Sequence, residues 1–109
     1  MTDRFSLTAE RTGSVAVLAL RGEVDVYAAP LLRTRLQELV VGDSETVAVD
    51  LSGASFLDSS GVGVLIGARK RLAANGRRLI LRSPSPEARS VIAILGLEEY
   101  FGLEASPIS

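Results

Sequence analysis

The sequence has no cysteine and no histidine among its 109 residues. Without cysteine there are no disulfides, thiolate metal sites or cysteine nucleophiles. Without histidine the commonest general base and metal ligand is missing, so the chain lacks the residues that most hydrolases and metalloenzymes use for catalysis. We therefore expect a protein that is not an enzyme and that holds neither a metal nor a cofactor.

A strong charge of either sign is also missing, since the formal net charge is −1 and only 5% of the residues are aromatic. This composition offers no electrostatic or stacking argument for nucleic acid. The basic run 68–78 is a local exception that we expect to be a solvated helix face. No apolar run reaches the roughly 20 residues that cross a bilayer, and the chain start lacks the features of a signal peptide. We expect a cytoplasmic protein with neither nucleic acid nor membrane as its partner.

The residues that are present fit an ordinary globular domain. The chain is 47% hydrophobic and 23% charged, with no internal repeat, low-complexity tract or linker. Its length is enough to bury a single core. The sequence therefore predicts one domain over residues 1–109, and its modest charge favours a monomer or weak dimer.

Short apolar runs alternate with amphipathic stretches along the chain. The runs 14–20, 46–51 and 79–81 predict strands, of which the first two should be buried on both faces. Apolar residues recur at helical spacing in 30–42, 59–74 and 86–96, and the opening stretch 4–10 predicts an edge strand. This alternation predicts an α/β fold with a mixed, mostly parallel sheet and right-handed crossover helices.

The segment 56–63, FLDSSGVG, places an acidic residue, two hydroxyls and two glycines between a predicted strand and a predicted helix. One interpretation is helix capping, because Asp or Ser before a helix accepts hydrogen bonds from free backbone N–H groups. Capping leaves three candidate caps in a row unexplained, and Val62, three residues after Ser59, cannot complete a capping box. A cap and a functional turn therefore both stay open at this point.

Two enzymatic interpretations of the same segment fit less well. An aspartic protease loop has no extra serine before its glycine and belongs to an all-β fold. A nucleotide-binding turn needs a different glycine spacing from that of Gly61, Gly63 and Gly67, and no Lys-Ser/Thr pair completes a P-loop. A nucleotide-binding or hydrolytic enzyme is therefore kept only as a remote alternative. We predict instead that Gly63 and Gly67, four residues apart on the helix, permit close packing against the sheet.

Three motifs in order resemble the STAS domain of bacterial anti-sigma factor antagonists. They are LRGEVD (20–25), VAVDLSGASFLDSSGVGVL (47–65) and LEEYF (97–101). The resemblance covers nearly the whole chain and implies a STAS-type fold that captures an anti-sigma factor and so frees a sigma factor. In this family the anti-sigma factor is usually a serine kinase of the histidine-kinase-like ATPase fold, and a metal-dependent serine phosphatase reverses its action.

The resemblance also implies roles for single residues. The first serine after the aspartate accepts phosphate in this family, and here that serine is Ser59. In this family phosphorylation ends binding. We expect the partner-binding residues to surround the same serine: Asp25, Asp58, Ser59, Ser60 and Gly61. The residues themselves leave two roles open for Asp25, as part of the same rim or as a cap for the following helix. A phosphate on Ser59 is expected to lie against backbone N–H groups at the helix start.

The chain departs from the family pattern in two places. The segment 26–30, VYAAP, is apolar where many family members are polar, so the choice of partner in that region stays open. The chain also ends soon after residue 101, so a final helix of longer members would be short or missing. The alternative function is a STAS subunit of a transporter ATPase or of a stress-signalling assembly. Such relatives often lack the serine, so the complete DSSG favours the antagonist.

Overall fold

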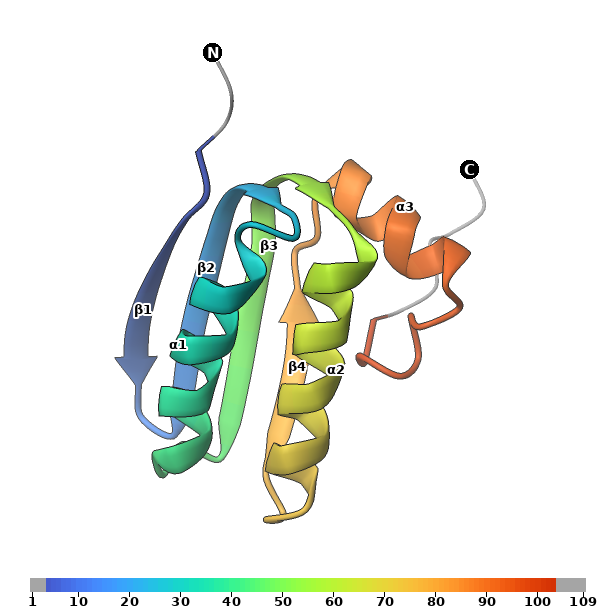
Figure 1. Ribbon diagram of the computed structural model, residues 1–109. Helices are drawn as coiled ribbons and strands as arrows, with labels where there is room; N and C mark the ends of the chain where they lie inside the picture. Colours follow the sequence, from blue (N-terminus) through green and yellow to red (C-terminus); the bar gives the residue numbers. More distant parts are fainter. Residues whose placement is uncertain (1–3, 104–109) are drawn as a thin grey trace.

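The computed structural model describes residues 4–103, in which a four-stranded sheet carries two helices side by side on one face and a third near its edge (Figure 1). The elements in chain order are β1 (Ser6–Thr12), β2 (Val15–Val24), α1 (Ala29–Val41), β3 (Thr46–Leu57), α2 (Ser59–Ala73), β4 (Arg78–Arg82) and α3 (Pro86–Ile94). The strand order is β1-β2-β3-β4, with β1 antiparallel to β2 and the other neighbours parallel. The predicted α/β fold with a mixed, mostly parallel sheet is confirmed. The predicted absence of a full final helix concerns residues 104–109, which lie outside the described residues.

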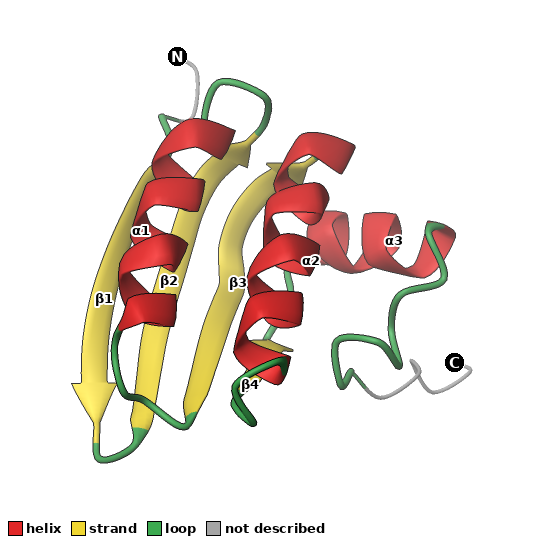
Figure 2. Ribbon diagram, turned by 60° about the horizontal axis from the view of Figure 1, so that its bottom comes forward, coloured by secondary structure: helices red, strands yellow, loops and turns green. Residues whose placement is uncertain are grey.

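Helices α1 and α2 lie on the same face of the sheet (Figures 1 and 2). Strands β2, β3 and β4 follow one another across the sheet, so two right-handed crossovers in the same direction place both helices on one side. The prediction that 14–20 is buried on both faces is therefore wrong. Leu18 and Leu20 face the helices and are buried, whereas Val17 and Ala19 on the other face are only half-buried. Within residues 4–103, no helix combines the length and the apolar character that crossing a membrane requires.

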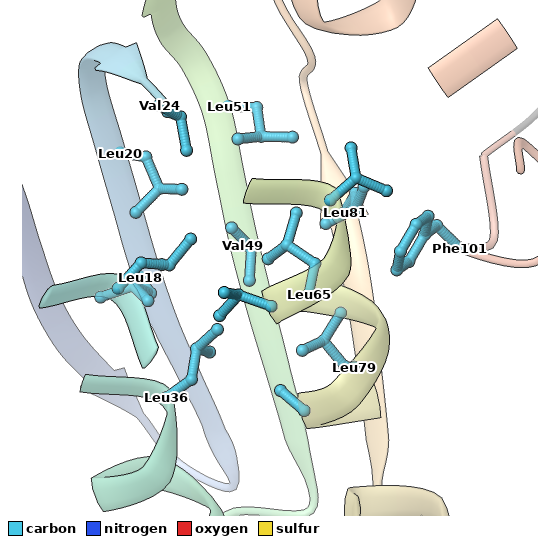
Figure 3. Packing of buried hydrophobic residues seen from close by; sticks show 14 of the residues in the cluster. Leu18, Leu20, Val24, Leu36, Val49, Leu51, Leu65, Leu79, Leu81 and Phe101 are labelled. Atoms are coloured by element: carbon cyan, nitrogen blue, oxygen red, sulfur yellow. The ribbon is translucent and has the colours of Figure 1, made fainter. Parts of the chain in front are cut away.

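The hydrophobic core lies between this face of the sheet and the helices (Figure 3). The buried side chains shown there come from β2, β3 and β4, from α1 and α2, and from the segment after α3. Those labelled are Leu18, Leu20, Val24, Leu36, Val49, Leu51, Leu65, Leu79, Leu81 and Phe101. Burial of each such side chain contributes about 1.5 to 3 kcal/mol. Phe101 lies next to Leu81, and its carbonyl oxygen accepts the N–H of Leu81 at 3.4 Å, so the chain after α3 closes the edge of the sheet.

Strand β3 continues six residues beyond its predicted end at Leu51. The small and polar residues after Leu51 resemble a turn, but pairing with β2 resumes at Gly53 opposite Arg21, after a shift in register. A Cβ on Gly53 would lie 3.0 Å from the Arg21 side chain, which favours glycine at this irregularity. The pairing then runs on to Leu57 opposite Val24, so β2 and β3 end side by side.

The carboxyl end of α1 is held by an arginine from a distant part of the chain. The guanidinium of Arg77 donates to the carbonyl oxygens of Leu39 (2.8 Å), Val40 (2.5 Å) and Ser44 (2.6 Å). The last carbonyls of a helix have no partner within the helix, and a positive charge near them is favoured by the helix dipole. The expectation of a purely solvated basic run is therefore wrong at Arg77, which ties α1 to the start of β4.

Replacing this arginine tests its contribution to stability. Arg77→Met keeps the unbranched apolar stem of the side chain but removes the N–H groups that donate to Leu39, Val40 and Ser44. We therefore expect the free energy of unfolding to fall by about 1 to 3 kcal/mol. The control is Arg78→Met, at the exposed neighbouring side chain, which should change it by less than about 0.5 kcal/mol. Urea unfolding measures both variants. Equal stability of the two would show that the Arg77 contacts contribute nothing.

Candidate functional site

The β2–α1 and β3–α2 connections meet at one end of the sheet, at the top of Figure 1. Val24 and Leu57 are register partners at the ends of β2 and β3, and the N–H of Asp58 donates to the carbonyl oxygen of Val24 at 3.2 Å. An aspartate follows each strand directly, Asp25 after β2 and Asp58 after β3. The structure therefore brings Asp25 and the turn 58–61 together. In the described part of the chain, acidic side chains form no group of three that could hold a metal ion.

Asp58 is the N-cap of α2. Its carboxylate Oδ1 accepts the N–H groups of Ser60 at 2.9 Å and of Gly61 at 3.2 Å, and its backbone is extended. The capping interpretation is therefore correct for Asp58. Ser59 follows the cap as the first helical residue, so the start of α2 does not depend on a serine hydroxyl.

Ser59 is exposed, whereas Ser60 is half-buried. The N–H groups of Ser60 and Gly61 already donate to Asp58. That a phosphate on Ser59 would lie against backbone N–H groups stays a prediction. A phosphate at Ser59 would add about −1.5 to −2 charges next to an existing carboxylate. The turn thus presents an exposed serine hydroxyl next to a carboxylate that already uses two N–H groups of the helix start.

Asp25 organises the turn that leads into α1. Its carboxylate Oδ1 accepts the N–H groups of Tyr27 and Ala28, both at 3.0 Å, and its carbonyl oxygen accepts those of Ala28 (3.1 Å) and Ala29 (3.0 Å). Ala28, the N-cap of α1, provides no capping side chain. The Asp25 side chain therefore stabilises the turn 25–28 that precedes α1 and does not cap the helical residues themselves. Asp25 lies beside the Asp58 turn as well.

Gly61 is the glycine that allows α2 to approach the sheet. A Cβ on Gly61 would lie 2.9 Å from Val24 Cγ1 and 3.2 Å from the Val24 carbonyl oxygen. A Cβ on Gly63 would meet no atom within 4 Å, and one on Gly67 would meet only the Arg71 side chain, at 3.9 Å. The packing prediction is therefore wrong for Gly63 and Gly67, because the face of α2 that they share does not contact the sheet.

The predicted site residues did not include a group of exposed apolar side chains at the same end of the sheet. These side chains are Val26, Tyr27, Leu31 and Phe56. Tyr27 and Leu31 line an open recess whose other lining residues are Arg4, Phe5, Glu23, Asp25 and Ala28. Phe56 does not line it, and is the register partner of Glu23. The available signal was the apolar segment 26–30, whose composition does not show which of its side chains are exposed.

Comparisons with known proteins cover almost the whole chain. A family model for the STAS domain matches residues 6–108. The chain is 38% identical over 87 residues to the anti-sigma F factor antagonist of Lysinibacillus sphaericus. The aligned region covers 79% of this chain and 74% of the relative. It also resembles the solved anti-sigma factor antagonist SpoIIAA in its unphosphorylated form, with a TM-score of 0.77 and 32% identity over 94% of this chain and 90% of that one. For SpoIIAA of Bacillus in the phosphorylated form, the TM-score is 0.70 at 32% identity, over 94% and 93% of the two chains.

Alanine substitution separates the two glycines of the turn and helix. Gly61→Ala should lower the free energy of unfolding by about 1 to 3 kcal/mol, because the new methyl group meets the backbone of Val24 and cannot be accommodated by a side-chain movement. Gly63→Ala is the matched control and should raise it by about 0.5 to 1 kcal/mol, since alanine favours a helix and space is open there. Thermal unfolding measures both. A Gly61→Ala protein as stable as wild type would show that the approach at Val24 is not tight.

Proposed function

Because this chain belongs to the STAS-domain family of anti-sigma factor antagonists, we propose that it binds an anti-sigma factor and thereby frees a sigma factor. The observation that carries the proposal is the exposed position of Ser59 directly after the cap Asp58. Its hydroxyl is accessible to a kinase, and the fold does not depend on it. We infer that Ser59 is the phosphoacceptor and that Asp25, Asp58, Ser60 and Gly61 form the partner-binding rim around it.

The partner in this proposal is an anti-sigma factor that is also a serine kinase of the histidine-kinase-like ATPase fold. In the kinase reaction, the Ser59 Oγ forms a bond to the γ-phosphorus of ATP, the bond to the β-phosphate oxygen breaks, and ADP leaves. The hydroxyl proton goes to a base of the kinase. A serine phosphatase reverses the modification by hydrolysis, which releases inorganic phosphate. The chain itself provides the acceptor and no catalytic group.

Charge at the rim explains how phosphorylation would end binding. If the partner presents a carboxylate about 6 Å from the phosphate, each unit charge is repelled by about 3 kcal/mol at an effective dielectric constant near 20, or about a hundredfold in affinity. The N–H groups of Ser60 and Gly61 donate to Asp58, so the start of α2 has little left to neutralise the added charge. Repulsion at the interface is sufficient, and no change of conformation is required.

The same proposal includes the remaining properties of the chain. Residues 1–109 would act as one domain, a cytoplasmic binding module that is a monomer or weak dimer and not an enzyme. The absence of cysteine and histidine and the net charge of −1 support this view. Neither nucleic acid nor a membrane is a partner in this proposal.

Two substitutions at the phosphoacceptor separate a charge switch from capping. Ser59→Ala should abolish phosphate incorporation by the cognate anti-sigma factor and keep binding. Ser59→Asp should weaken binding at least about tenfold through its added charge, while the melting temperature stays within a few degrees because an exposed residue changes. Binding titrations, phosphopeptide mapping and thermal unfolding measure these effects.

The control for this experiment is Ser60→Ala, which should still be phosphorylated at residue 59. Phosphate found on Ser60 of the wild-type chain would contradict the assignment. So would a Ser59→Asp protein that binds as tightly as wild type. If a serine hydroxyl were a cap, Ser59→Ala would instead cost about 1 kcal/mol of stability.

A further inference from the structure

Strand β4 is the last strand of the sheet, and the chain after α3 closes its outer edge only at the carboxyl end (Figures 1 and 2). The N–H of Arg78 points inward and donates to the carbonyl oxygen of Glu45 at 2.9 Å. That of Leu81 points outward and donates to the carbonyl oxygen of Phe101. Successive residues of a strand direct their N–H and C=O groups to opposite sides, so Leu79 turns both groups outward, as Leu81 does.

An open recess of about 260 Å³ lies along the edge at Leu79. Its lining comes from Arg69 and Ala73 of α2, from residues 77–80 and from residues 99–102. An extended peptide that enters the recess meets the outward N–H and C=O of Leu79. The recess is therefore placed for a strand to be added to β4.

The chain itself already uses this edge in the same way. The carbonyl oxygen of Phe101 accepts the N–H of Leu81, and the Phe101 ring lies next to Leu81 (Figure 3). The preceding outward residue, Leu79, is about 7 Å away along the strand. The edge thus binds main chain at one outward residue and has its neighbouring outward residue beside the recess.

Positive charge predominates around this recess, where three arginines stand against one carboxylate, that of Glu99. The guanidinium of Arg77 is engaged at the carboxyl end of α1, whereas Arg78 is exposed. The guanidinium of Arg69 lies 3.9 Å from the centre of the Tyr100 ring. Such stacking holds a guanidinium in place with its charge intact, and guanidinium groups bind carboxylates through paired hydrogen bonds. Arg69 and Arg78 therefore suit acidic side chains of an occupant.

We propose that the edge of β4 at Leu79 is a second docking site, where an acidic segment of a partner protein binds in extended form as an added strand. The backbone of this segment pairs with Leu79, and its acidic side chains contact Arg69 and Arg78. The inference goes beyond the proposed function and does not depend on it. Arg69 comes ten residues after Ser59 on α2, about 15 Å along the helix, so a partner at this edge leaves the Ser59 turn accessible.

The observations favour an acidic peptide over two other occupants. A small anion accepts hydrogen bonds only, so it would leave the outward C=O of Leu79 without a donor, whereas a peptide backbone offers a donor and an acceptor. A second copy of this chain, paired edge to edge through β4, would bring the arginines of the two recesses together. Like charges at close range weaken association, and an acidic segment is attracted.

Binding of a labelled peptide to the full chain tests the site. The probe is a short peptide that alternates glutamate and valine, with both ends blocked, and wild type should bind it with a Kd of about 1 mM or tighter. Arg69→Glu and Arg78→Glu should each weaken binding at least about tenfold, because each reverses a charge that contacts the peptide. The matched control is Arg33→Glu, at an exposed residue of α1, which makes the same change in net charge and should bind as wild type does.

Two further measurements test the strand pairing itself. A peptide methylated on every backbone nitrogen keeps its side chains but has no N–H to donate, so it should bind at least about tenfold more weakly. When the unmethylated peptide binds, hydrogen exchange at the amide of Leu79 should slow at least about tenfold. The amide of Leu81 already donates to Phe101 and should keep its exchange rate.

Ser59→Asp should bind this peptide as wild type does, so failure of the docking site and failure of the proposed function are seen separately. The docking site is overturned if wild type does not bind the peptide, or if Arg69→Glu and Arg78→Glu bind it as tightly as Arg33→Glu. Equal binding of the methylated peptide would show that the recess takes a carboxylate and not a strand. Slower exchange at Leu79 with rising concentration of the chain alone would identify a second copy as the occupant. Binding by a chain ended at Leu103, but not by the full chain, would identify residues 104–109 as the occupant.

Discussion

The contact between the first turn of α2 and the last residues of β2 determines the geometry of the candidate site. Gly61 places the helix backbone so near Val24 that one added carbon atom would not fit. Val24 and Leu57 are themselves core residues and register partners, so the hydrophobic core holds the start of α2 in place. The position of Ser59 is therefore anchored by packing, although Ser59 itself contacts the solvent.

The two connections at this rim use the same local solution. Asp25 and Asp58 each follow a strand and turn a carboxylate oxygen toward two backbone N–H groups of the chain ahead. In both turns an exposed side chain follows shortly, Tyr27 in one and Ser59 in the other. The acidic residues thus keep the turns in shape, which leaves their exposed neighbours available for a partner.

The sequence predicted the order and type of the elements because its apolar periodicity and its Gly and Pro signals agree. It did not predict the end of β3, because Gly53 belongs to an irregularity in pairing that resembles a turn when β2 is not in view. Periodicity places Gly63 and Gly67 on one face of a helix but does not tell what that face meets, so Gly61 was not recognised as the packing residue. The contacts of Arg77 with the end of α1 join segments more than 30 residues apart, and no local pattern indicates them.

The separation of capping from modification has an evolutionary consequence. Since Asp58 caps α2 and Ser59 does not, a codon change at position 59 would remove the proposed control by phosphate without the loss of a cap. Under the proposed function, one copy of a duplicated gene could lose the serine and become a permanently active binder, while the other would keep its control by phosphate. Selection on stability would not oppose such a change, because the cap of α2 is Asp58.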